Sequence, residues 1–282
     1  MADMATHDAL RDAIARDPEL SLVRPFLPQG QRDGQIALHA LLNEIRQSVF
    51  SVSDESIARV KLAWWRDELE RLLNGRASHP LTESLARRAD WQRLDGEELG
   101  ELLEGVLMRL EARLYNDDDE MLLHCWRNEG AAAVCSARLA GAAEGATLRA
   151  ARDLGLARAL LHIVLGFEEE RQQQRCWIPA ERIRMAGGDA AGLITDGIEP
   201  DRRAELLEGI AVLAEARHAQ ALEMAPSGQE RKTLRMAALM TALPLRQLQR
   251  LRRKDFREGG IGPLARLLAV WRVARREAGI SG

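Results

Sequence analysis

Residues 154–183 read LGLARALLHIVLGFEEERQQQRCWIPAERI, and this stretch decides the fold. Apolar residues recur at intervals of three and four over its first three turns, which predicts an α-helix. These turns are apolar on nearly every side, so we expect the helix to be buried on most sides. Polarity changes abruptly at Glu168, and Pro179 is expected to end the element before a short helix over 180–185. Such a pattern is typical either of a core helix that emerges into solvent or of a helix that holds metal ions at a cavity.

The order of residues in this stretch resembles the second signature of the squalene/phytoene synthase family. The matching positions are Leu154, Gly155, Ala157, Leu160, Ile163, Glu169, Arg175 and Pro179, with Trp177 at an aromatic position of the family. The departures fall on polar and charged positions. Leu165 replaces an arginine, Gly166 the first aspartate, Glu170 the second aspartate, and His162 an asparagine. The resemblance therefore implies the family's fold, with several of its polar and charged residues replaced.

A second resemblance covers residues 37–75, ALHALLNEIRQSVFSVSDESIARVKLAWWRDELERLLNG. It looks like the family's first signature, followed by its W-W-R-x-E-L helix at residues 64–69. Catalytic members carry an aspartate cluster on the first of these helices, and that cluster aligns with Arg46, Gln47 and Phe50. None of the three is acidic. The local pattern is closest to a side branch of the family that contains a mitochondrial complex I assembly factor and is also short of the aspartates.

The resemblance implies an all-α fold, a single domain over residues 1–282 with a central cavity, whose family core spans about residues 15–255. By the resemblance, the candidates for lining the cavity are Asn43, Arg46, Gln47, Phe50, His162, Leu165, Gly166 and Arg175, and the remaining metal candidates are Glu169 and Glu170. Family members join two isoprenoid diphosphates head to head, with magnesium bridging the aspartates and the diphosphates. Hard cations need several oxygen ligands, so the loss of three carboxylates and the gain of Arg46 should abolish this magnesium cluster.

Composition favours a helical globular protein on independent grounds. Hydrophobic residues make up 46% and charged residues 29% of the chain, with almost no strand-like alternation. The net charge of -3 gives no reason to expect nucleic acid as a partner. Three cysteines show neither metal-ligand spacing nor even pairing, and neither an apolar leader nor a membrane-spanning run is present. These features predict a soluble, cytoplasmic protein.

Residues 246–276 have the most uneven balance of charge in the chain. Ten basic residues stand there against two acidic ones, a net charge of +8, so the rest of the chain carries -11. Leucines and Trp271 give the segment an apolar side. A basic amphipathic segment of this kind can lie on an anionic membrane surface or on an acidic partner. The alternative is a terminal helix that packs its leucines on the body of the protein and leaves its arginines in solvent.

Three local patterns carry further predictions. Ser53 is expected to cap the helix that contains the two tryptophans, which we assign to core packing. The acidic residues 117–120 precede an apolar run, so they are interpreted as a helix cap with first-turn acids rather than a metal site. Pro244 is expected to end a helix over 232–243.

Three hypotheses for the function follow. The first is a non-catalytic binding or assembly protein, without a cofactor, that retains an apolar cavity for an isoprenoid or lipid. The second is an active head-to-head prenyltransferase with an altered site and magnesium. The third is a membrane-surface adaptor that acts through residues 246–276. For the cavity mouth we expect Arg46 to point inward and to pair with Glu169 or Glu170 in place of the lost metal, the alternative being an Arg46 on the solvent side of its helix.

Overall fold

The computed structural model describes residues 2–111, 114–143, 145–195, 197–228, 230–256 and 262–277, and every regular element in these ranges is helical. The expected all-α class is confirmed. The longer helices are α1 (Ala2–Arg16), α3 (Gln29–Phe50), α4 (Glu55–Leu73), α6 (Gly96–Glu111), α9 (Ala146–Leu165), α13 (Pro200–Met224), α14 (Arg235–Arg252) and α15 (Pro263–Glu277). The shorter ones are α2 (Pro18–Val23), α5 (Pro80–Arg88), α7 (Asp118–Cys125), α8 (Ala131–Leu139), α10 (Phe167–Gln172), α11 (Ala180–Met185) and α12 (Ala190–Ile194).

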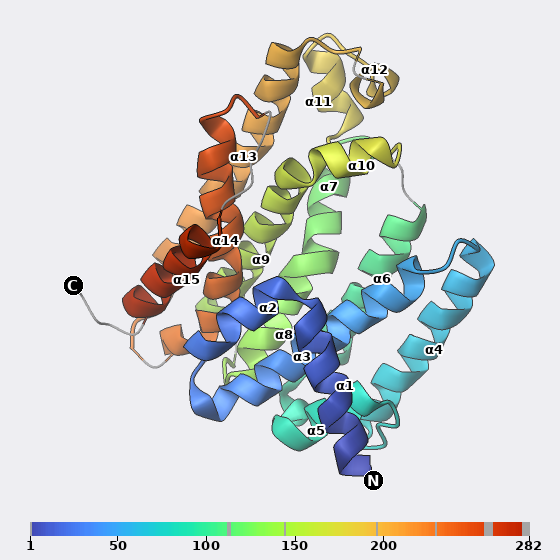
Figure 1. The fold of residues 1–282 in the computed structure, drawn as a ribbon, viewed down its shortest axis with the longest axis vertical. Coiled ribbons are helices and arrows are strands. Elements are labelled where there is room, and N and C mark those ends of the chain that lie inside the picture. Colours follow the sequence, from blue (N-terminus) through green and yellow to red (C-terminus); the bar gives the residue numbers. More distant parts are fainter. Residues whose placement is uncertain are drawn as a thin grey trace.

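Helix α9 is the central element of the bundle. It contacts α13 and α14 on one side and α7 and α8 on another, and Figure 1 shows it running through the middle of the molecule. Fifteen of its twenty residues are buried. This is the all-round burial that its sequence pattern predicts. The helix ends earlier than expected, however, because Gly166 breaks it before the acidic run, and the separate short helix α10 follows.

Between α7 and α8 the backbone widens into a π-helical turn, η3 (Trp126–Gly130). Helix α9 crosses this turn at Gly155, where a Cβ atom would collide with the backbone of Glu129 and Gly130. Only glycine permits so close an approach. Isolated π-turns inside α-helices often lie at functional sites, because they shift the direction of the side chains that they carry.

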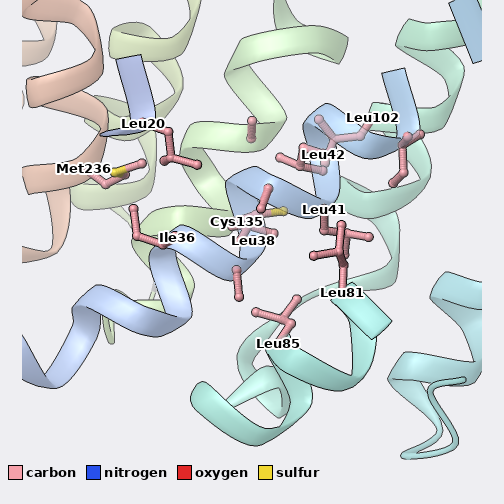
Figure 2. Close-up of a cluster of buried hydrophobic side chains, with 14 of the residues drawn as sticks. Leu20, Ile36, Leu38, Leu41, Leu42, Leu81, Leu85, Leu102, Cys135 and Met236 are labelled. Atoms are coloured by element: carbon pink, nitrogen blue, oxygen red, sulfur yellow. The ribbon is translucent and has the colours of Figure 1, made fainter. Parts of the chain in front are cut away.

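A second part of the core lies around α3. Leu38 and Leu41 of α3 pack with Leu81 and Leu85 of α5, as Figure 2 shows, and all four are buried. Burial of leucines at this scale stabilises the fold by about 2 kcal/mol for each side chain. The packing fixes α3 along its length and so determines where its polar residues lie.

The structure corrects two further predictions of helix boundaries and one of packing. Asp54, not Ser53, caps α4, since its carboxylate accepts from the backbone N–H of Ser56 at 2.8 Å. Pro244 does not end its helix, because it is buried and the surrounding packing carries α14 through to Arg252. Trp65 is in the core as expected, but Trp64 is 44% exposed. The Asp117 cap of α7 is confirmed, since its carboxylate accepts from the N–H of Glu120.

The basic segment at the C-terminus is divided between two helices. Its first part is the end of α14, and its last part is α15, which packs on α14 and α2. Figure 1 shows α15 on the outside of the bundle beside α14. Arg257 and Glu258 lie outside the described residues, as does the side chain of Arg276. Within the described part of the chain, no helix has the length and apolarity needed to cross a bilayer.

Candidate functional site: a cavity closed by ion pairs

A cavity of about 320 Å³ opens at one end of α9. Helices α3, α6, α7, α9 and α10 contribute to its wall, together with the turn η3 and the segment before α11. The residues that line it are Arg46, Gln47, Phe50, Arg109, His124, Asn128, Glu129, Ala159, His162, Ile163, Glu170 and Trp177. Apolar side chains and charged groups therefore face the same space.

Five of the ten predicted site residues line this cavity: Arg46, Gln47, Phe50, His162 and Glu170. The other five are Asn43, Leu165, Gly166, Glu169 and Arg175, and they are absent from its described lining. Asn43 donates a hydrogen bond to Asp17 instead. Because α9 ends at Gly166, α10 takes a new direction, which leaves Glu169 exposed and Glu170 on the cavity.

Arg46 points into the cavity, but its partner is not the expected one. Its Nη2 lies 3.5 Å from Oε1 of Glu129 and donates to the carbonyl oxygen of Asn128 at 2.8 Å. Glu170 is paired with Arg109 instead, with 2.5 Å between Nη2 and Oε1, and Glu169 is exposed. The predicted pair between Arg46 and Glu169 or Glu170 is therefore wrong. The π-helical turn brings Glu129 to this side of the cavity, and the sequence pattern gives no sign of that turn.

Glu129 is the centre of a buried chain of charges. Its second oxygen accepts from Arg158 of α9, and Arg158 also donates to Glu19 of α2 at 2.7 Å. Burial alone would raise the pKa of Glu129, but Arg158 and Arg46 together lower it to about 2. The carboxylate is therefore ionised at neutral pH and held by two guanidinium groups. Opposite charges at this range favour the charged form of both partners.

The second pair, Arg109 and Glu170, lies against the aromatic part of the cavity. The guanidinium of Arg109 is 5.4 Å from the ring centre of Phe50 and 5.9 Å from that of Trp177. Arginine over an aromatic face is attracted by the ring quadrupole. The ion pair and the two rings thus hold one another in place.

The histidines at and near the cavity are neutral. Burial, followed by the charges of Arg109 and Arg46, lowers the pKa of His124 to about 3, and burial and Arg158 lower the pKa of His39 to a similar value. The pKa of His162 is also lowered by burial and by Arg158. The hydroxyl of Tyr115 bonds to Nδ1 of His124 at 2.7 Å, and the His124 ring stacks on Trp177.

The family resemblance implies a magnesium site, but the side chains that line this cavity do not provide the ligands for one. Among the described residues that line the cavity, the carboxylates are Glu129 and Glu170, and each is bound to an arginine. No group of three or more metal-ligating side chains occurs in the part of the chain that the structure describes. Magnesium binds through carboxylates with free oxygen atoms and through water, in octahedral geometry.

Sequence reasoning missed Arg109, His124, Asn128 and Glu129 as residues of the site. Arg109 lies in a helix whose pattern is simply amphipathic, and His124 has no partner at ligand spacing in the sequence. Glu129 is the residue that could have been predicted from the sequence. It begins a stretch rich in alanine and glycine, where a lone carboxylate that becomes buried needs a charged partner.

The protein is an all-α bundle with a cavity lined by charged and aromatic side chains. Comparison with known sequences shows the family to which it belongs. The chain belongs to the squalene/phytoene synthase family, whose sequence model matches residues 15–272. A chloroplastic phytoene synthase 3 from Zea mays is 27% identical over 173 residues, which are 59% of this chain and 40% of the relative. A 15-cis-phytoene synthase from Paracoccus sp. is 33% identical over 92 residues, 33% of this chain and 30% of the relative. The chain thus spans less than half the length of these curated relatives.

Solved structures show the same fold. A dehydrosqualene synthase in complex with ligand superposes with a TM-score of 0.81 at 16% identity, covering 99% of this chain and 100% of the other. The squalene synthase HpnC from Alicyclobacillus acidocaldarius gives a TM-score of 0.76 at 15% identity, covering 90% and 95% of the two chains. At these identities the likeness establishes the fold alone.

Proposed function

We propose that this protein binds an isoprenoid or lipid molecule in the cavity without condensing two substrates. The observation that carries the proposal is the ion pairing of Glu129 with Arg46 and of Glu170 with Arg109. Guanidinium groups already occupy both oxygen atoms of Glu129 and Oε1 of Glu170. Oε2 of Glu170 is buried without a hydrogen-bond partner among the described residues, and one free carboxylate oxygen is far short of the ligand set that magnesium needs. The protein then acts without a metal cofactor, as a binding or assembly protein.

The charge balance supports this proposal. Arg46 and Arg109 offset the charges of Glu129 and Glu170, and the histidines of the lining are neutral. A unit charge at about 4 Å interacts by roughly 4 kcal/mol at an effective dielectric of 20. At equal distances, repulsion of a divalent cation by each guanidinium is as large as its attraction to each carboxylate. The site offers a magnesium ion no net gain.

The size of the cavity also supports binding rather than condensation. Ligand pockets of proteins are on the order of 300–1,000 Å³, and at about 320 Å³ this cavity is near the lower limit. It has room for one chain of modest length, whereas condensation needs two. Phe50, Ile163 and Trp177 provide an apolar wall for such a chain.

Thermal unfolding with farnesyl diphosphate and with farnesol, each with and without magnesium, tests the proposal. We expect a ligand-dependent rise in stability that is the same with and without the metal, and no condensed product. Ligand at a hundredfold excess over Kd stabilises by about 2.7 kcal/mol. Ala159→Leu fills the cavity and should abolish the rise, whereas Ala63→Leu, at an exposed position of α4, should leave it unchanged.

The alternative activity is head-to-head prenyl transfer. It is favoured by the curated relatives, which are named phytoene synthases. A rise in stability that depends on magnesium, or a condensed product of thirty or forty carbon atoms, would establish this alternative and contradict the proposal.

A second proposed role is attachment to a membrane surface through the basic C-terminal segment. The specific observation is that α15 has leucines and Trp271 exposed on its outer side while Val270 and Ala274 are buried against the body. An amphipathic helix with arginines beside its apolar face is typical of proteins that lie in the plane of a membrane interface. This role is compatible with lipid binding in the cavity and does not depend on it.

A further inference from the structure

A groove of about 340 Å³ lies where the end of α14 meets the beginning of α15. Its described lining consists of Arg246, Gln249, Arg250, Arg253, Lys254 and Ala265. Four of these six residues are cations and none is acidic. A groove lined in this way attracts anions, because cations that share a concave surface add their fields.

Most of this positive charge is not neutralised by the protein. Arg250 and Arg253 are exposed and form no ion pair within the described ranges, and Arg246 donates to Gln249, a neutral side chain, at 2.7 Å. Arg252, on the same turns of α14, is different. It is held by both Glu208 and Glu215 of α13, with bonds of 2.6–2.8 Å. The arginine that faces the body is compensated, whereas those that face the groove are left for something outside the chain.

The helix beside the groove presents an apolar row to solvent. Leu264 is 70% exposed and Trp271 is 41% exposed, and Leu267 and Leu268 between them are also exposed. These positions are spaced i, i+3, i+4 and i+7, which places them on one face of α15. The guanidinium of Arg275 lies 4.8 Å from the Trp271 ring centre, so the row is bordered by a further cation.

The helix is also anchored, so this row cannot be covered by simple repacking against the body. Val270 and Ala274 of α15 are buried along the flank of this row that faces the body, and Arg235 of α14 donates to the carbonyl oxygen of Ala274. The apolar row and the groove are adjacent, since Leu264 in the row is followed directly by Ala265 in the groove.

We propose that this groove binds the phosphate of an anionic phospholipid headgroup while Leu264, Leu268 and Trp271 enter the interfacial layer of the bilayer. The inference deepens the second proposed role, since it names the lipid chemistry and the residues that recognise it. Arginine matches phosphate oxygens with two parallel N–H donors, and tryptophan and leucine beside such a site suit the boundary between headgroups and acyl chains. An acidic protein surface would match the arginines but would not account for the exposed row of leucines.

Flotation of the full chain with vesicles tests the proposal. Wild type should bind phosphatidylcholine vesicles that contain about one third phosphatidylglycerol, and should bind pure phosphatidylcholine vesicles at least tenfold more weakly. Binding should weaken as salt rises, because exposed charges are screened. Each arginine near an anionic leaflet contributes about fivefold in affinity, so Arg250→Gln with Arg253→Gln should reduce binding by at least tenfold.

A matched double variant, Arg59→Gln with Arg66→Gln on α4, removes the same charge from exposed positions elsewhere and should change binding less than twofold. Equal losses of vesicle binding in both double variants would contradict the groove as the headgroup-binding site. If Leu264→Ser with Trp271→Ser abolishes binding and the groove variant does not, membrane attachment stands and the phosphate site is wrong. If wild type binds neither vesicle, the membrane role itself is wrong. If it binds both equally, attachment does not depend on anionic lipid, and the proposed headgroup site is wrong. Circular dichroism of each variant checks that the fold is retained.

Discussion

Nη2 of Arg46 lies 3.5 Å from Oε1 of Glu129, and this contact joins α3 to the π-helical turn η3 at the cavity. The side chains are 25% and 12% exposed, so the pair is largely withdrawn from water. Arg158 holds the other oxygen of Glu129. A carboxylate held by two arginines therefore lies beside the part of α3 that aligns with the family's first aspartate cluster.

Glu129→Gln should lower the free energy of unfolding by roughly 3 kcal/mol. Removal of one partner of a buried ion pair leaves the other charge uncompensated, and here Arg46 and Arg158 would share the loss. Urea unfolding measures the change. Glu83→Gln breaks a pair with Arg87 that is exposed at the surface, and it should cost less than about 1 kcal/mol. Similar costs for the two variants would mean that the Glu129 network is open to water.

Stability should fall as the pH drops below about 6.5. The pKa of His39 and of His124 is about 3 in the folded protein, lowered mainly by burial, against a usual value of 6.5. The unfolded chain therefore takes up protons first, and the folded state loses about 1.4 kcal/mol per pH unit for each such histidine across the window from 6.5 to 3. Urea unfolding at several pH values in that window measures the slope.

His39→Gln should make this slope shallower, because one buried neutral histidine is removed while a side-chain amide can still bond to Ser136. The control is His7→Gln at an exposed position of α1, which should leave the slope unchanged. An identical slope in wild type and His39→Gln would refute a neutral, buried His39.

Gly155→Ala should destabilise the protein by about 1–3 kcal/mol. The new methyl group would collide with the backbone of η3 at Glu129, and overpacking of a tight core has costs of this size. It should also move Glu129 and weaken ligand binding in the cavity. Gly100→Ala in α6 is the matched control, since its Cβ would meet nothing within 4 Å, and there alanine should stabilise by up to about 1 kcal/mol. Thermal unfolding of both variants distinguishes the two effects.

The sequence predicts the fold of this protein better than its candidate site. The periodicity of α9 shows both its helical form and its burial, because these depend on the spacing of apolar residues alone. The inward direction of Arg46 could also be predicted from its place on α3. Its partner could not, since a π-helical turn has no clear sequence pattern and depends on how α9 packs at Gly155.

Pro244 shows the same limit in another form. A proline inside a sequence pattern ordinarily marks a helix end, because it removes a backbone donor. Here α14 continues to Arg252, where the two glutamates of α13 hold its last turn and Leu248 is buried. Tertiary contacts outweigh the local preference, and the groove beside α15 exists because the helix continues.

Calorimetric titration of magnesium into the protein, in the presence of farnesyl diphosphate, tests the central claim most directly. With Glu129 and Glu170 held by arginines, we predict no saturable heat of metal binding beyond that of magnesium with the diphosphate alone. Saturable binding of magnesium to the protein complex, at a stoichiometry of one or more ions, would contradict the claim that ion pairs have replaced the metal.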